Sequence, residues 1–207
     1  MSPSLSPRSP SALADEVVAL VVALPPTRPV RVLLDGVGSR SLSDALVPGL
    51  AAAGRAPLQV SAGDFLRPAG ERLEWGREDV EAFRTTWLDA AALDREVLSA
   101  SGVYLPALWD AEADRSARRP VEPVPAGAAL LVDGILLLGR GLPAELTVHV
   151  ALSPAALLRR GVPEWQLPAF ADYDSSVRPA EVCDVLVRAE DPLRPAVLVR
   201  SCGSRPR

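Results

Sequence analysis

Short apolar runs alternate with amphipathic stretches along this chain, and the alternation predicts its secondary structure. Runs of branched apolar residues predict buried strands, and apolar residues three or four positions apart predict helices. The predicted strands are residues 30–34, 58–61, 128–138, 146–152, 182–187 and 197–199. The predicted helices are residues 11–24, 41–54, 79–99 and 153–160, with Ser41 as the N-cap of the second. This order is typical of a three-layer α/β fold, in which helices cover a parallel sheet and functional groups lie at the carboxyl ends of the strands.

The two ends of the chain differ in composition from its middle. Residues 1–10 are rich in serine and proline, which predicts a disordered N-terminal tail. Residues 11–200 carry the strand and helix pattern and are long enough to form a single domain with a buried core. Residues 201–207 then form a C-terminal tail, and the charged, proline-rich residues 110–125 are expected to form a surface loop.

A glycine-rich turn follows the first predicted strand, in the sequence DGVGSRS over residues 35–41. A strand, a glycine turn and a helix start bring backbone N–H groups and the helix dipole to one point, a geometry that binds phosphate. The full P-loop pattern is G-x-x-x-x-G-K-[ST], and the interval from Gly36 to Arg40 is two residues shorter. The candidate phosphate-binding residues are Gly36, Gly38, Ser39, Arg40 and Ser41.

Three aspartates stand where a parallel sheet places functional groups. Asp35 ends the first strand, Asp64 follows the second, and Asp133 lies in the third apolar run. In phosphoryl transfer, one carboxylate can accept the proton of the attacking hydroxyl and another can help to hold Mg²⁺. The structural alternative for each residue is a buried carboxylate that caps a turn.

Charge and composition limit the kinds of partner that are expected. The formal net charge is −4, which gives no electrostatic reason to expect a nucleic-acid partner. The longest apolar stretch of the first helix, residues 17–24, is far short of the roughly 20 residues of a membrane span, so no membrane partner is expected. Two cysteines, Cys183 and Cys202, form no disulfide framework, and a reduced cytoplasmic setting is expected. The sequence does not indicate the oligomeric state.

Several segments together resemble the uridine kinase-like branch of the P-loop nucleoside kinases. They are VRVLLDG over 30–36, VSAGDFLRP over 60–68, LLVDGILL over 130–137 and RPAEVCDVLV over 178–187. The resemblance implies a P-loop NTPase fold and the transfer of a phosphoryl group from ATP to a hydroxyl of a nucleoside or nucleotide. It also implies that Asp64 is the general base, that Ser41 and Asp133 lie on the Mg²⁺ side, and that Arg159 or Arg160 is the lid arginine.

The sequence departs from that family in its cationic residues and in two segment lengths. All 22 basic residues are arginine, so the P-loop lysine is absent, and the turn and the lid segment 161–167 are short. Arginine carries a planar fork of donors and does not act as a compact point charge. Two hypotheses follow. One is a kinase with a rebuilt phosphate site, and the other is a non-catalytic protein of the same fold that binds a nucleotide or a partner.

The remaining candidates have structural interpretations as well. His149 is the only histidine, and its apolar neighbours favour a hydrogen-bonded histidine in a strand over a catalytic one. Without a second histidine or a cysteine at ligand spacing, a zinc site is not expected. Trp87 has helical spacing and is expected in the core, whereas Trp109 and Trp165 lie in loops and are candidates to stack on a base.

Overall fold

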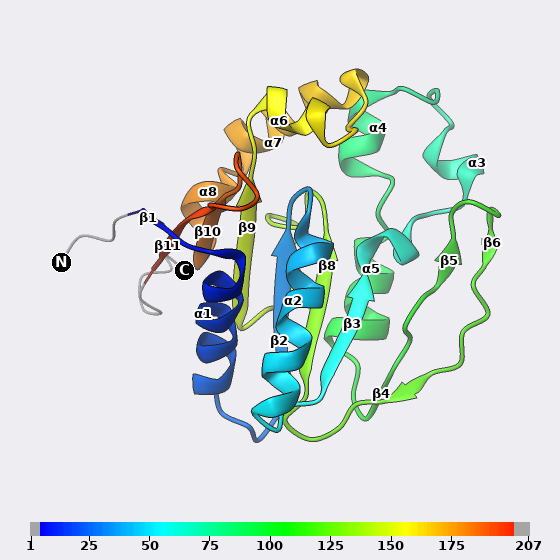
Figure 1. Cartoon of the computed structure of the whole chain (residues 1–207). Coiled ribbons are helices and arrows are strands. Elements are labelled where there is room, and N and C mark those ends of the chain that lie inside the picture. Colours follow the sequence, from blue (N-terminus) through cyan, green and yellow to red (C-terminus); the bar gives the residue numbers. More distant parts are fainter. Residues whose placement is uncertain (1–4, 201–207) are drawn as a thin grey trace.

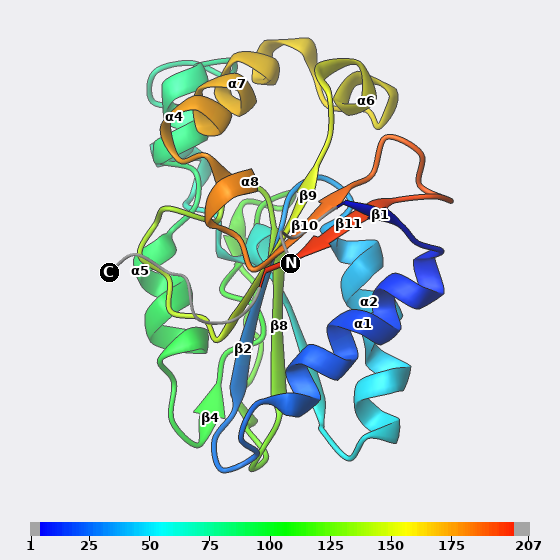
Figure 2. The ribbon, with the colours of Figure 1, turned by 90° about the vertical axis from the view of Figure 1, so that its left-hand side faces the viewer.

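A computed structural model describes residues 5–200, which form a seven-stranded sheet with helices on both faces (Figures 1 and 2). The strand order is β1-β11-β10-β9-β2-β8-β3, in which β10, β9, β2, β8 and β3 run parallel. The strands are β1 Ser6–Pro7, β2 Val30–Asp35, β3 Pro57–Ser61, β8 Ala129–Gly134, β9 Leu146–Ala151, β10 Val185–Arg188 and β11 Ala196–Val199. The expected α/β architecture with a parallel central sheet is therefore confirmed. At one edge of the sheet, β11 runs antiparallel to β10, and β1 runs antiparallel to β11.

Helices cover the two faces unequally. The helices are α1 Pro10–Ala23, α2 Ser39–Ala52, α3 Ala69–Arg72, α4 Val80–Thr85, α5 Ala90–Leu93, α6 Pro154–Arg159, α7 Leu167–Ser176 and α8 Pro179–Val182. Helices α1 and α2 lie side by side on one face of the sheet, and α5 lies on the other (Figures 1 and 2). Helices α4, α6 and α7 lie beyond the carboxyl ends of the central strands, above the predicted site (Figures 1 and 2).

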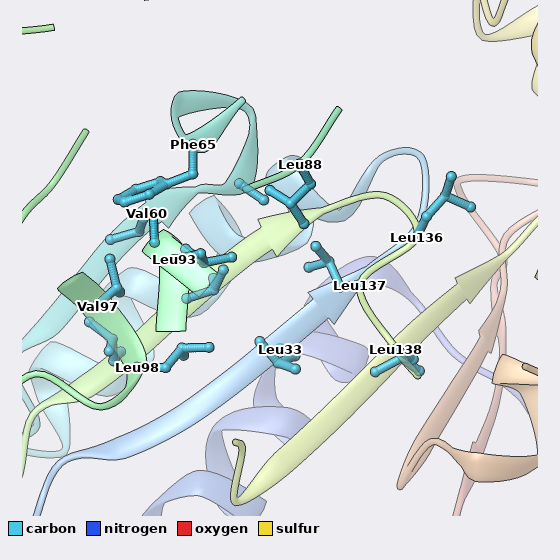
Figure 3. Packing of buried hydrophobic residues seen from close by; sticks show 14 of the residues in the cluster. Leu33, Val60, Phe65, Leu88, Leu93, Val97, Leu98, Leu136, Leu137 and Leu138 are labelled. Atoms are coloured by element: carbon cyan, nitrogen blue, oxygen red, sulfur yellow. The ribbon is translucent and has the colours of Figure 1, made fainter. Parts of the chain in front are cut away.

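Alternating side chains of the central strands form two cores. Leu34 of β2 packs with α1 and α2, whereas Leu33 packs into the cluster on the opposite face. Figure 3 shows that opposite cluster, which Leu33 shares with Phe65 and Leu93. Because the strands are buried on both faces, they are continuous apolar runs in the sequence, as parallel strands usually are.

Helix starts and ends follow local sequence signals. Helix α1 begins after Ser9, whose hydroxyl accepts a hydrogen bond from the Ala12 N–H (3.2 Å), and Pro10 is its first residue. Strand β1 pairs with β11, so residues 6–10 of the expected disordered tail belong to the fold. Residues 1–4 and the expected C-terminal tail 201–207 lie outside the described residues.

The expected N-cap at Ser41 is wrong, because α2 already begins at Ser39 with Gly38 as its N-cap. Gly38 has φ +94°, a conformation that glycine adopts without steric cost. The helix continues through Pro48 to Ala52.

The single helix expected over 79–99 is also wrong. Asp79 caps α4 and Asp89 caps α5, and a π-helical turn, Asp94–Leu98, follows α5. Between the two helices the chain is extended, and the Asp89 N–H donates to the Phe65 carbonyl (2.9 Å). The second aspartate cap and this pairing with the segment after β3 explain the break.

The expected surface loop 110–125 contains short strands, and one expected strand is shorter. Two small hairpins occupy residues 103–123 and overlap that loop. These pair β4 Val103–Tyr104 with β7 Glu122–Pro123 and β5 Trp109–Asp110 with β6 Arg115–Ser116. The strand expected over 128–138 ends at Gly134, after which the chain turns. No helix formed by residues 5–200 is long and apolar enough to cross a membrane.

Candidate functional site

The turn after β2 is short and forms hydrogen bonds to β8 and within itself. Three residues, from Gly36 to Gly38, separate β2 from α2. The Gly36 N–H donates to the Gly134 carbonyl (2.8 Å) and the Ser39 N–H donates to the Gly36 carbonyl (3.1 Å). The Ser39 hydroxyl also donates to the Gly134 carbonyl (3.3 Å). These two N–H groups therefore already have protein acceptors, and the Gly36 N–H and the Ser39 hydroxyl both bond to the end of β8.

Arg160, at the C-terminal end of α6, lies close to Gly38 in this turn. A Cβ added to Gly38 would lie 2.6 Å from Nη1 of Arg160, and Nη2 of Arg160 donates to the Ala189 carbonyl (3.0 Å). Arg160 therefore lies against the N-terminal end of α2, on the phosphate side of the predicted site. Arg159 points elsewhere: its nearest acid is Glu190 at 3.7 Å, and its side chain is 63% exposed.

Arg40 lies beside the carboxyl end of β8. It is the second residue of α2, and its Nη1 is 3.4 Å from Oδ1 of Asp133, while its Nε is 3.2 Å from Oδ1 of Asp44. The Asp133 side chain is only 6% exposed. Burial raises the pKa of the Asp133 carboxyl, and the Arg40 guanidinium opposes that rise. Ser41, the expected metal-side hydroxyl, is an exposed residue one position further along α2.

The charge of the same guanidinium also acts on Asp64. Asp64 lies in a 3₁₀ turn, Ala62–Phe65, directly after β3, and β3 is the strand next to β8. Burial raises the pKa of the Asp64 carboxyl and Asp110 adds to the rise, whereas Arg40 and Arg119 oppose it. The structure therefore brings Asp64, Asp133 and Arg40 together at the carboxyl edge of the sheet. Parallel strands end at the same edge, so the residues at their carboxyl ends lie close to one another.

These residues do not fit a magnesium ion. Mg²⁺ needs oxygen ligands in near-octahedral geometry. Asp133 is paired with Arg40, Ser39 donates its hydroxyl proton to a backbone carbonyl, and Ser41 is exposed. Among residues 5–200, no group of three His, Cys, Asp or Glu side chains is placed to hold a metal.

The third aspartate, Asp35, has a structural role. It is fully buried, and its carboxylate accepts hydrogen bonds from the Leu137 N–H (2.8 Å) and the Tyr173 hydroxyl (2.8 Å). Its Oδ2 also lies 2.7 Å from Nδ1 of His149, which is the residue in register with Asp35 on β9. His149 is thus a hydrogen-bonded strand histidine. Tyr173 was not a candidate in the sequence, since only the folded chain brings α7 over β2.

A small cavity adjoins this buried group. It lies between Gly36, Leu136, His149 and Phe170 and has a volume of about 40 Å³. That volume suits a water molecule, which occupies roughly 30 Å³ in the liquid, and is too small for a nucleoside.

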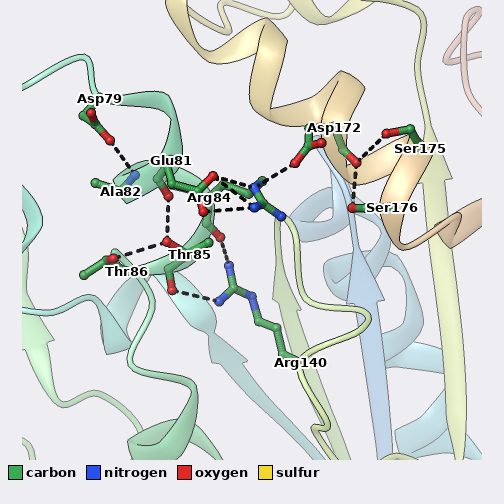
Figure 4. Close-up of polar contacts among 10 residues, drawn as sticks. All are labelled: Asp79, Glu81, Ala82, Arg84, Thr85, Thr86, Arg140, Asp172, Ser175 and Ser176. Atoms are coloured by element: carbon green, nitrogen blue, oxygen red, sulfur yellow. Dashed lines mark hydrogen bonds and ion pairs between the residues drawn. The ribbon is translucent and has the colours of Figure 1, made fainter.

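Arginine contacts hold the helices above the sheet in place (Figure 4). Arg84 of α4 forms an ion pair with Asp172 of α7 (3.0 Å). Arg140 donates to the Thr85 carbonyl (3.4 Å), to the Arg84 carbonyl and to the Leu136 carbonyl (2.6 Å). The arginines link α4 to α7 and to the turn after β8.

Both candidate stacking tryptophans already contact other side chains of the protein. Trp165 packs with Phe83 (ring centroids 5.4 Å apart) and Trp87 (5.9 Å) under α7. Trp109 lies in a hairpin near Asp64 and donates its Nε1–H to Asp114 (3.1 Å).

Comparison with known proteins identifies the fold. No protein-family model and no curated protein sequence matches this chain. Among solved structures, a possible uridine kinase from Bacillus stearothermophilus is similar with a TM-score of 0.69 and 16% identity, over 84% of this chain and 96% of that one. A fructose transport system kinase from Silicibacter has a TM-score of 0.48 and 20% identity, over 84% of this chain and 89% of that one. The chain has the P-loop kinase fold.

Proposed function

We propose that this chain is a uridine kinase-like protein that binds a nucleoside or nucleotide at the carboxyl edge of its sheet. We further propose that it transfers little or no phosphoryl group from ATP. The fold supports the ancestry, and the sequence segments around Asp64 and Asp133 support the location of the site. Arg40, Asp64 and Asp133 would contact the ligand.

The closed turn after β2 carries this proposal. A P-loop stabilises the transferring phosphate with several free N–H groups and a lysine. Here the Gly36 and Ser39 N–H groups donate to carbonyls, and the chain contains no lysine. Loss of one preorganised contact of this type typically lowers the rate on the order of 10²–10³-fold. Loss of several would leave transfer near the uncatalysed rate.

The acceptor side of the site keeps its polar groups. Asp64 is partly buried, and its raised pKa follows from that burial. A carboxylate in such a place gains a hydrogen bond when a ligand hydroxyl approaches, because the bond replaces water that burial has removed. Asp64 therefore supports the recognition of a ribose-type hydroxyl even without transfer.

Calorimetric titration tests the binding. Uridine, cytidine and ATP are titrated separately into the protein, each with and without Mg²⁺. We expect a nucleoside or nucleotide to bind, and we expect Asp64→Asn to weaken that binding at least tenfold. Glu81→Gln, an exposed carboxylate on α4, is the matched control and should bind as the wild type does. If none of the three ligands binds at millimolar concentration, the proposal is wrong.

An active kinase with a rebuilt phosphate site is the second candidate. Arg160 favours it, because its guanidinium lies at the N-terminal end of α2, where a phosphate would approach. A phosphoryl-transfer assay with uridine and ATP separates the two candidates. Turnover that both Asp64→Asn and Arg160→Ala abolish would establish the kinase and overturn the proposed loss of transfer.

A further inference from the structure

The guanidinium of Arg40 supplies a positive charge beside the Asp133 carboxylate. The three-residue turn starts α2 early, so that its second residue is directed at the end of β8. The guanidinium lies between the Asp133 carboxylate at 3.4 Å and the Asp44 carboxylate at 3.2 Å. Its charge also acts on Asp64.

Asp133 needs a positive charge close by. An ionised carboxylate that is almost fully buried is unfavourable unless it is paired or coordinates a cation. Arg40 is the one cation bonded to Asp133 among the described contacts of residues 5–200. The pair therefore neutralises the carboxylate without any ion from solution.

The pairing also closes the site to a metal. A guanidinium is always charged, so its positive charge beside Asp133 repels a divalent cation that approaches the same carboxylate. Displacement of Arg40 by Mg²⁺ would break both of its carboxylate contacts and would place two cations next to each other. The intrinsic cation thus competes with any dissolved one.

We propose that Arg40 replaces a divalent metal at the Asp133 carboxylate, and that ligand binding at this edge is independent of Mg²⁺. The proposal deepens the proposed function and rests on it only for the identity of the ligand. The competition between Arg40 and a metal can be measured without any nucleotide.

Titration with Mn²⁺ alone, followed by electron paramagnetic resonance of the free ion, tests this inference. We expect the wild type to show no stoichiometric Mn²⁺ binding below about 1 mM. Removal of the guanidinium in Arg40→Ala should leave the Asp133 carboxylate without its counter-ion and tighten Mn²⁺ binding at least tenfold. The double variant Arg40→Ala/Asp133→Asn should lose that gain.

Two further variants make the outcome decisive. Arg160→Ala removes a guanidinium that contacts the turn but not Asp133, and it should behave as the wild type does. Circular dichroism shows whether Arg40→Ala folds. If it does not, Arg40→Gln replaces it in the titration, because glutamine keeps most of the side-chain volume without the charge. Tight binding of Mn²⁺ by the wild type would overturn the inference, as would equal Mn²⁺ affinity of the wild type and the Arg40 variants. Neither result bears on whether a nucleoside binds.

Discussion

Replacement of Asp35 by alanine should destabilise the fold strongly, because this carboxylate joins three separate parts of the chain. It lies at the end of β2 and accepts from the Leu137 N–H on the turn after β8, from the Tyr173 hydroxyl on α7, and contacts His149 on β9. None of these groups has access to bulk water to replace Asp35, since His149 and Tyr173 are also buried.

The magnitude follows from the groups left without a partner. Each buried donor that loses its acceptor costs about 1–3 kcal/mol, and values within one network do not add fully. Asp35→Ala should therefore lower the free energy of unfolding by about 3–5 kcal/mol. For a chain of this length, each kcal/mol corresponds to roughly 2–4 °C in Tm. A fall of about 6–20 °C in Tm is expected.

Urea and thermal denaturation followed by circular dichroism measure the effect. Tyr173→Phe removes one donor and should cost about 1–2 kcal/mol. Asp15→Ala, an exposed aspartate on α1, should change stability by less than about 0.5 kcal/mol. A loss below about 1 kcal/mol for Asp35→Ala would refute the argument that this network stabilises the carboxyl edge.

Three further predictions concern the residues around the site. Gly38→Ala should cost about 1–2 kcal/mol in a denaturation experiment, because φ is +94° there. Addition of Arg160→Ala should not restore the loss, since the strain lies in the backbone; full rescue would show that the clash with Arg160 was the cause. Burial raises the pKa of Asp133, so ionisation of this group opposes folding. Asp133→Asn should therefore raise the free energy of unfolding at pH 7, with the gain lost as the pH falls below about 4, where unfolded aspartate is itself protonated. A gain that persists in acid would contradict this account. Arg140→Ala should speed hydrogen exchange in α4, because Arg140 donates to the Arg84 carbonyl at the end of that helix. Unchanged exchange there would show that the contact does not hold α4.

The sequence predicts the central sheet well because its signals are local. Apolar runs such as 30–34 and 129–133 are buried on both faces, which is typical of parallel strands. The break within 79–99 is harder to predict, although Asp89 is a second N-cap. Its extended residues pair with the segment after β3, a contact that periodicity within one stretch cannot express.

The site is less predictable, because its geometry depends on register and on loop length. The sequence places Asp64 and Asp133 at strand ends, and the structure brings them together around Arg40. The pairing of Asp35 with His149 requires the register of β2 with β9, which the sequence does not contain. The start of α2 at Ser39 decides which side chains face Asp133, and one residue along a helix rotates a side chain by about 100°.

The proposed loss of phosphoryl transfer rests on the length of the turn after β2 more than on residue type. In the short turn, the Gly36 N–H donates to the Gly134 carbonyl, and the Ser39 N–H at the start of α2 donates to the Gly36 carbonyl. The same shortening directs Arg40 at Asp133 and gives the carboxylate a permanent counter-ion. In the proposed function, the loss of phosphoryl transfer and the independence from a metal would then have one structural cause, the short turn. Substitution of a lysine for Arg40 alone should not restore transfer, because the closed turn would remain.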